Sequence, residues 1–205
     1  MTFCEEKRYK WVLTLDQDSV CPSNMIEEYK KYIEIPDIAI ISPIIVDRNI
    51  TKSSEEKKYN NSYELIDECI TSAALTNISI WKEISGFDEY MFIDLVDHEY
   101  CKRVRINGNK IIRVNTVILL HEMGHVTQHK FLGKEVNVMN HSAFRKYYMA
   151  RNTLYCAKKH KKFGSVIYAY IRISILILRT LLYEQNKWGK ICKIIQGIKD
   201  GIKRT

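Results

Sequence analysis

A strand-like run that ends in acidic residues most limits what this chain can fold into. Residues 11–15 read Trp-Val-Leu-Thr-Leu, a short apolar run typical of a strand buried in a sheet. A helix-start signal at Pro22-Ser23-Asn24 and helical spacing over 25–34 follow it, and a second β-rich run covers 38–46. Strand, helix and strand at this spacing form a βαβ unit. The sequence therefore predicts an α/β fold with a mostly parallel sheet covered by helices.

Further elements follow from the same periodicities. Asn77 is placed to cap a short helix that runs to Ile84, and a longer helix ends at Asn107-Gly108. Beyond residue 140 the pattern is helical, in three pieces divided near Gly164 and Gly189. The remaining expected elements are a strand within 65–75, that longer helix over 96–106 and a β-rich stretch over 110–120.

Charge divides the chain into two predicted domains. Residues 1–140 carry 17 basic and 22 acidic side chains, a net of −5, whereas residues 141–205 carry 15 basic and 2 acidic, a net of +13. The basic tail is expected to meet an anionic partner, and a solvated helical face is the alternative. We do not expect nucleic acid, because no recognition motif accompanies the charge.

The tail also has an amphipathic pattern that suits a membrane surface. Ile167, Ile171, Ile175 and Leu178 recur at helical spacing, which favours an interfacial helix resting on anionic lipid. Packing of that helix onto the rest of the chain is the alternative. No run of eighteen uninterrupted apolar residues occurs, so a conventional membrane span is not expected. The N-terminus lacks an export signal, and the six scattered cysteines are expected to be reduced cytosolic thiols.

Asp16 and Asp18 follow the first predicted strand directly. In an extended backbone residues i and i+2 point the same way, so both carboxylates can face one cation at the carboxyl end of a strand. Mg²⁺ or Mn²⁺ would use these oxygens and leave its other positions to phosphate and water, which suits a nucleoside-diphosphate substrate. A solvated acidic turn is the competing interpretation.

A second acidic cluster lies at the start of the helix predicted over 96–106. Carboxylates stand at positions 88, 89, 94, 97 and 99 among apolar neighbours. A helix N-terminus stabilises carboxylates, so capping explains part of the pattern. Partial burial raises the pKa of a carboxylate, so a general base with helper acids explains it as well.

The segment His121-Glu122-Met123-Gly124-His125 matches the His-Glu-x-x-His pattern of zinc peptidases. That chemistry needs two histidines one helical turn apart, and hence a helix through residues 118–127. Residues 117–120 are apolar and begin with the β-branched Val117 and Ile118, which instead indicates a strand. A peptidase with Glu135 or Glu184 as the third ligand stays open as an alternative function.

Taken together, four segments resemble family 2 glycosyltransferases of the bacterial rhamnosyltransferase type. They are Trp-Val-Leu-Thr-Leu-Asp-Gln-Asp-Ser at 11–19, the acidic segment at 86–100, Leu120-His121 with Gly124, and Arg-x-Tyr-Tyr-x-x-Arg-Asn at 145–152. The resemblance implies an A-type glycosyltransferase fold, a divalent metal and inversion at the anomeric carbon. It implies transfer of a deoxysugar, such as rhamnose from dTDP-rhamnose, to a lipid-linked or polysaccharide acceptor during synthesis of a cell-surface polysaccharide. This places the chain in the cytoplasm at the inner face of the membrane.

The resemblance also implies roles for individual residues. Asp97 would be the catalytic base, and the metal would be bound by Asp16, Asp18 and His121. The donor would be bound by Asp16, Asp18, Arg145 and Arg151, and the acceptor by Asp94, Glu99 and Ser72.

Two departures from the family pattern qualify these roles. The family's chain begins with a strand–helix–strand segment for the nucleotide base, which we expect to be missing before Met1. The segment Thr71-Ser72-Ala73-Ala74 stands where relatives have Ser-Gly. An inactive, truncated membrane-associated remnant is therefore a further alternative.

Overall fold

The computed structural model describes residues 1–17, 19–47, 61–121, 127–131, 134–160 and 163–203. By internal contacts the chain divides into a first unit, residues 1–88 and 97–123, and a second unit, residues 89–96 and 124–205. This division differs from the boundary expected at residue 140. The hairpin before that position belongs to the second unit, and so does the short segment 89–96.

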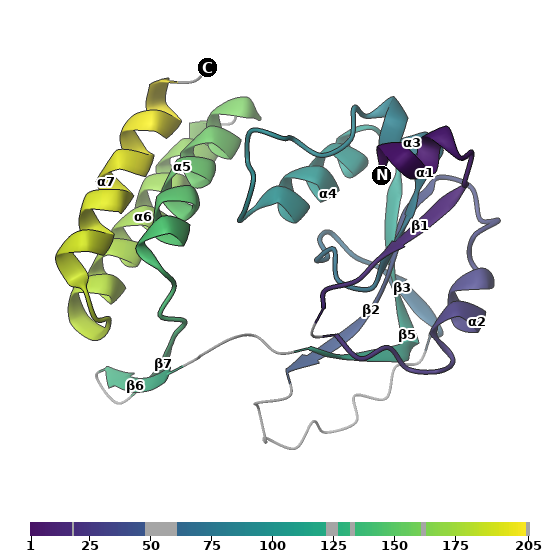
Figure 1. Ribbon diagram of the computed structural model, residues 1–205, viewed down its shortest axis with the longest axis horizontal. Helices are drawn as coiled ribbons and strands as arrows, with labels where there is room; N and C mark the ends of the chain where they lie inside the picture. The colour runs from purple at the N-terminus through teal and green to yellow at the C-terminus, as the bar shows by residue number, and fades with distance from the viewer. Residues whose placement is uncertain (18, 48–60, 122–126, 132–133, 161–162, 204–205) are drawn as a thin grey trace. The chain divides into compact units, whose positions relative to one another are not determined.

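The first unit is a sheet of five strands in the order β1-β4-β2-β5-β3 (Figure 1). Its strands are β1 (Trp11–Thr14), β2 (Ile38–Asp47), β3 (Tyr63–Leu65), β4 (Ala74–Asn77) and β5 (Lys110–His121). Its helices are α1 (Thr2–Glu6), α2 (Met25–Lys30), α3 (Ile78–Glu83) and α4 (Val96–Ile106). The α/β class is thus confirmed. So are the helix over 96–106 and the cap at Asn77, whose side chain accepts from the backbone N–H groups of Ser79 and Ile80.

The expectation of a mostly parallel sheet is wrong. β2 pairs in parallel with β5, whereas β4 runs antiparallel to both β1 and β2, and β3 runs antiparallel to β5. The reason is that β4 inserts between the first two strands of the predicted βαβ unit. β1 and β2 still point the same way, because each runs opposite to β4, so their carboxyl ends lie at one edge of the sheet.

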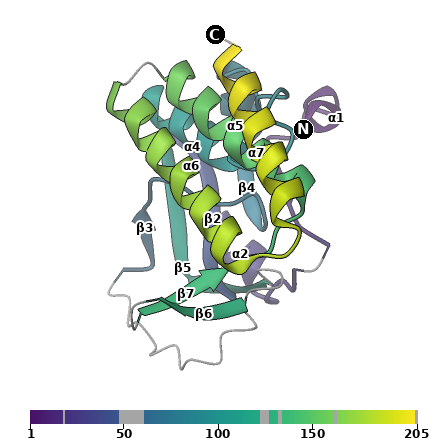
Figure 2. The same ribbon diagram turned by 90° about the vertical axis from the view of Figure 1, so that its left-hand side faces the viewer.

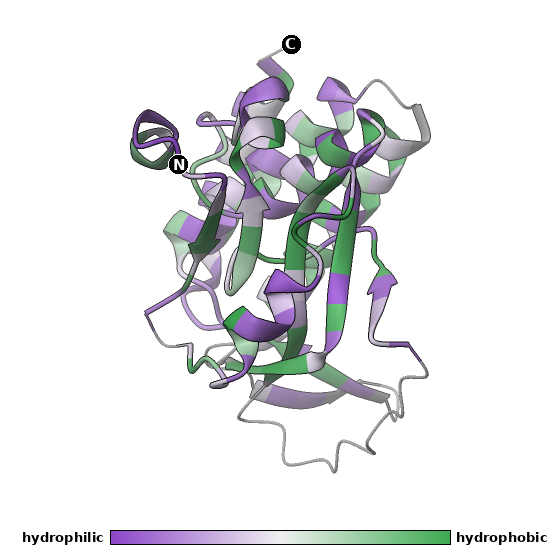
Figure 3. Ribbon diagram, turned by 90° about the vertical axis from the view of Figure 1, so that its right-hand side faces the viewer, coloured by the Kyte–Doolittle hydropathy of each residue, from purple (hydrophilic) through white to green (hydrophobic). Residues whose placement is uncertain are grey.

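Both faces of this sheet are covered, which agrees with the many hydrophobic residues, coloured green, along its central strands in Figure 3. On one face Ile41 and Ile112 pack with Met25 and Tyr29 of α2. On the other face, residues of alternate direction pack against Tyr100, Cys101 and Val104 of α4.

The second unit consists of a hairpin and three helices, shown together in Figure 2. The hairpin is β6 (Thr127–Phe131) with β7 (Lys134–Val138), and the helices are α5 (Ala143–Lys159), α6 (Phe163–Tyr183) and α7 (Lys187–Lys203). α7 lies so close to α5 that a Cβ atom at Gly197 would come within 2.3 Å of the Tyr147 carbonyl oxygen. Gly197 and Gly201 are thus what permit this packing.

α6 is more apolar than its sequence pattern suggested. Over Ser165–Tyr183 its mean hydropathy is 1.7, which by length and composition is enough to cross a membrane. Arg172 and Arg179 interrupt the apolar run, as expected, without lowering its mean hydropathy below that level, and the expectation against a conventional membrane span stays a prediction. Ala169 and Ile173 pack in the helical core, while most of the remaining apolar side chains of α6 are exposed.

Candidate functional site

The first unit brings three separated segments together at one edge of the sheet. β1 ends at Thr14, which pairs with Ala74 at the start of β4, so the residues after β1 and those before β4 are neighbours. The Thr14 hydroxyl donates to the Thr71 carbonyl at 2.6 Å and fixes this junction. The predicted metal-site segment therefore faces the segment that carries Ser72.

Ser72 is buried and holds the chain after β1 in place. The Asp16 N–H donates to its Oγ at 3.4 Å, and the hydroxyls of Ser72 and Ser19 are hydrogen-bonded at 2.6 Å. Its side chain is 1% exposed, so the contacts seen here give Ser72 a positioning role for Asp16. The Asp16 side chain itself is exposed.

Asp97 lies on the other side of the same junction, in the first turn of α4. Its Oδ2 accepts from the Thr71 N–H at 3.4 Å. Burial raises the pKa of Asp97, the nearby charge of Asp16 adds to that rise, and the Thr71 hydrogen bond and His98 oppose it. One member of each predicted acidic cluster is thus present at the same edge. The Asp97 carboxylate is a better base than an exposed aspartate would be.

Glu99 does not face this edge. Its side chain is fully buried and forms a bidentate ion pair with Arg103 at 2.9 Å. Arg103 also donates to the carbonyl oxygens of Ile84 and Gly86. These contacts tie the end of α3 to α4, which is a structural task, and they do not support the predicted acceptor role.

In the second unit, Asp94 and Arg145 form one group. The Arg145 guanidinium donates through Nε and Nη2 to both carboxylate oxygens of Asp94 at 3.0–3.1 Å. Arg145 was assigned to the donor and Asp94 to the acceptor. The structure pairs the two, so whatever binds one of them also meets the other.

Arg151 and Asn152 clamp the segment 89–96. The Asn152 amide donates to the carbonyl oxygens of Met91, Ile93 and Asp94 at 2.7–2.8 Å. Arg151 donates to two carbonyl groups of the same segment, and its guanidinium stacks on Tyr90 at 4.1 Å from the ring centre. Arg151 was assigned to the donor, yet it is buried and committed to this segment. Sequence reasoning assigned no role to Asn152, although the motif contained it.

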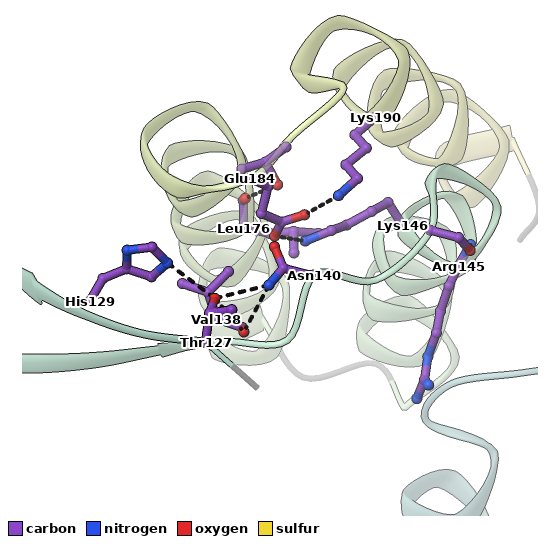
Figure 4. Close-up of polar contacts among 11 residues, drawn as sticks. Thr127, His129, Val138, Asn140, Arg145, Lys146, Leu176, Glu184 and Lys190 are labelled. Carbon is purple, nitrogen blue, oxygen red and sulfur yellow. Dashed lines mark hydrogen bonds and ion pairs between the residues drawn. The ribbon is translucent and has the colours of Figure 1, made fainter. Parts of the chain in front are cut away.

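A buried charge cluster connects the three C-terminal helices (Figure 4). Glu184 accepts from Lys146 at 2.5 Å and from Lys190 at 2.8 Å. Glu184 was a candidate zinc ligand, and its two lysine partners occupy both carboxylate oxygens. No residue pattern marked this cluster in advance, because its members lie up to 44 positions apart.

The structure tests the predicted zinc-peptidase motif and describes the side chain of only Asp16 among the predicted Mg²⁺ or Mn²⁺ ligands. Residues 118–121 lie in β5, which contradicts the helix that a zinc peptidase needs there. Asp18, Glu122, His125 and the side chain of His121 lie outside what the structure describes. Within the described ranges, no three His, Cys, Asp or Glu side chains are grouped to hold a metal. The exposed Asp16 carboxylate does fit a hard cation that takes one or two carboxylates and completes its shell with phosphate and water.

Comparison with known proteins gives one significant relative. No family model matches the chain. The dTDP-rhamnosyl transferase RfbF of Shigella flexneri is 24% identical over 216 aligned residues, which cover 97% of this chain and 71% of the relative. The match extends over nearly all of the chain, including the four segments quoted above, and it agrees with the resemblance that they carry.

Proposed function

We propose that this protein is a glycosyltransferase that moves a sugar from a nucleotide-diphosphate donor to a hydroxyl group of a glycan acceptor. The carrying observation is the placement of Asp97, a half-buried carboxylate of raised pKa, at the same sheet edge as the exposed Asp16. The relative's name adds dTDP-rhamnose as the first donor to test. A strand at residues 118–121 speaks against the peptidase alternative.

The chemistry follows from these two carboxylates. Asp97 accepts the proton of the acceptor hydroxyl group. At the same time the oxygen of that hydroxyl group forms a bond to the anomeric carbon of the donor sugar, and the bond from this carbon to the diphosphate breaks. A single displacement of this kind inverts the configuration and needs no protein nucleophile. Asp97 suits the role because burial keeps its proton affinity above that of an exposed aspartate.

Asp16 is proposed to face the donor's diphosphate. With Asp18 it would hold Mg²⁺ or Mn²⁺, and the His121 side chain is a further proposed contact. A bound divalent ion would neutralise the charge that develops on the leaving diphosphate. Calorimetry of dTDP-rhamnose binding with and without a chelator tests this. Equal affinity in both conditions would remove the metal from the proposal.

The decisive variant is Asp97→Asn, which keeps the size and the Thr71 contact but removes the base. We expect transfer to fall by about 10²–10⁴-fold, the usual contribution of a general base, with donor affinity nearly unchanged. Asp67→Asn is the matched control, because Asp67 is an exposed carboxylate of the same unit. Retained turnover in Asp97→Asn would refute its role.

We also propose that the protein works at an anionic membrane surface, on a lipid-linked acceptor at the inner face of the cell membrane. The support is the exposed apolar side of α6, formed by Ile167, Ile171, Ile175 and Leu178, in a tail of net charge +13. Flotation with vesicles should need anionic lipid and weaken with salt. Flotation indifferent to both would refute this part.

A further inference from the structure

Two exposed phenyl rings and a half-buried tyrosine form a group in the second unit, which we call the aromatic platform: Phe92, Phe144 and Tyr148. Phe92 lies 5.4 Å from Tyr148 and 6.3 Å from Phe144 between ring centres, and the latter two are 4.9 Å apart. Phe92 is 68% exposed and Phe144 is 55% exposed. Apolar rings of this size are normally buried, so their joint exposure calls for a ligand.

The backbone under Phe92 is held in a costly conformation. Phe92, Asp94 and Leu95 all have positive φ, at 58°, 66° and 62°. Each such residue costs about 1–2 kcal/mol for an L side chain. The clamp from Asn152 and Arg151 maintains this conformation. It is uncommon for a fold to hold a bulky ring in a strained conformation with most of its surface in solvent, and such strain clusters at ligand sites.

Fixed polar groups stand next to the rings. The first turns of α5 carry Phe144, Arg145 and Tyr148. Tyr148 follows Phe144 by four positions and Arg145 by three, so the three side chains form one surface patch. Arg145 is paired with Asp94, whose side chain is 13% exposed. An aromatic face beside a preorganised carboxylate–guanidinium pair thus offers an apolar surface and hydrogen-bonding groups in one place.

This combination matches a sugar ring. The C–H groups on one face of a pyranose carry partial positive charge and are attracted to the negative face of an aromatic ring. Its hydroxyl groups both donate and accept, so they can bind a carboxylate and a guanidinium together. A lipid chain would gain from the rings, but the carboxylate would oppose its insertion.

We propose that the aromatic platform, with Asp94 and Arg145, binds a sugar ring of the glycan acceptor. That the bound sugar belongs to the acceptor rests on the proposed function. That a sugar binds here rests on the second unit alone. Chain length supports the assignment, because Asp97 follows Asp94 by only three positions, which limits their Cα distance to about 11 Å.

The test uses the full chain without donor and a panel of methyl glycosides of hexoses, deoxyhexoses and N-acetylhexosamines. Saturation-transfer NMR should show at least one glycoside bound at millimolar concentration, with the C–H protons of one ring face shifted upfield by the aromatic rings. Phe92→Ala and Phe144→Ala should each weaken binding roughly tenfold, the equivalent of about 1.4 kcal/mol. Phe92→Tyr should restore it, and Trp188→Ala, which removes another exposed ring of this unit, should not change it.

The outcomes separate this inference from the proposed function. Asp97→Asn should bind the glycoside as the natural chain does, so binding that survives without any transfer activity supports the platform and not the enzyme. Transfer whose acceptor KM is unchanged in Phe92→Ala and Phe144→Ala would overturn the platform and leave the enzyme standing. Absence of binding across the panel would also overturn it, as would loss of vesicle flotation in Phe92→Ala, which would identify a lipid anchor.

Discussion

Replacing Asn152 with alanine should release the segment 91–95 without unfolding the protein. Asn152 is fully buried, and its amide is the donor to three backbone carbonyl groups of that segment. The segment contains the three residues of positive φ described above. Alanine removes the donor and leaves the rest of α5 intact.

The magnitude follows from the contacts. Three residues of positive φ cost about 3–6 kcal/mol in total. Three neutral hydrogen bonds contribute about 3 kcal/mol net, and the two charge-assisted bonds from Arg151 add about 3–6 kcal/mol. Without Asn152 the remaining bonds barely match the strain. If the segment stayed in place, the Ile93 and Asp94 carbonyl groups would lose their bond from Asn152 at about 1–3 kcal/mol each, whereas the Met91 carbonyl keeps its bond from Arg151. Relaxation avoids that cost, so the loss in free energy of unfolding should stay near 3 kcal/mol.

Amide hydrogen exchange measures the effect directly. Protection of the amides of 91–95 should fall by roughly a hundredfold in Asn152→Ala, while urea denaturation shows a loss of no more than about 3 kcal/mol. Gln196→Ala is the control, since Gln196 is an exposed amide whose loss should change stability by less than about 0.5 kcal/mol. Unchanged protection of 91–95, or a loss far above that limit, would show that the clamp does not hold the strained conformation.

Three further predictions concern buried charges. Arg103→Met removes the charge that balances buried Glu99 and should cost about 3–5 kcal/mol by urea denaturation, against about 0–1 kcal/mol for Lys31→Met, whose ion pair is at the surface. Burial raises the pKa of Glu184, but hydrogen bonds from its two lysines outweigh this and lower it. The ionised Glu184 therefore stabilises the folded protein above about pH 4.3, and this stabilisation is lost as the pH falls through the pKa of Glu184 in the folded state. In Glu184→Gln, unfolding followed by circular dichroism should no longer show this loss of stability at acid pH. The pKa of Asp97 is raised, so its ionisation costs stability above about pH 3.9. Asp97→Asn should thus be at least as stable at pH 7, and a marked loss would contradict this sign.

The sequence predicted elements well where a local rule decides them. The span of α4 and the cap at Asn77 depend on periodicity and on one side chain, and both were found. The order of strands depends on which distant segment inserts beside β1, and no local signal marks β4 as that segment. The hairpin β6–β7 was missed because β6 is polar and β7 shows alternation only over Val136 and Val138, which is too short a pattern to predict a strand.

The candidate site divides in the same way. The places of Asp16 after a strand and of Asp97 at a helix start could be predicted, because both are visible in residue type and spacing. Glu99 and Arg151 have the same residue types but are committed to internal partners, Arg103 in one case and backbone carbonyls in the other. Asp94 and Arg145 were assigned to different substrates, because the sequence does not show that 51 intervening positions bring them into one ion pair. Burial and pairing decide such cases, and both are properties of the fold.

Residues with positive φ occur in two kinds of setting in this protein. Among the described residues, several of those with positive φ are Asn or Asp or follow the end of a helix, where this conformation is common. Neither setting applies to Ala73, Phe92 and Leu95, which are not Asn or Asp and do not follow the end of a helix. Ala73, at φ 57°, lies beside Ser72, at the position where the resembling family has glycine. Phe92 and Leu95 flank Asp94. The strain therefore lies beside Ser72, which positions Asp16, and beside Asp94, which is proposed to bind the acceptor. Since strain of this kind persists only where surrounding contacts maintain it, its location is an argument for the site that owes nothing to the motifs.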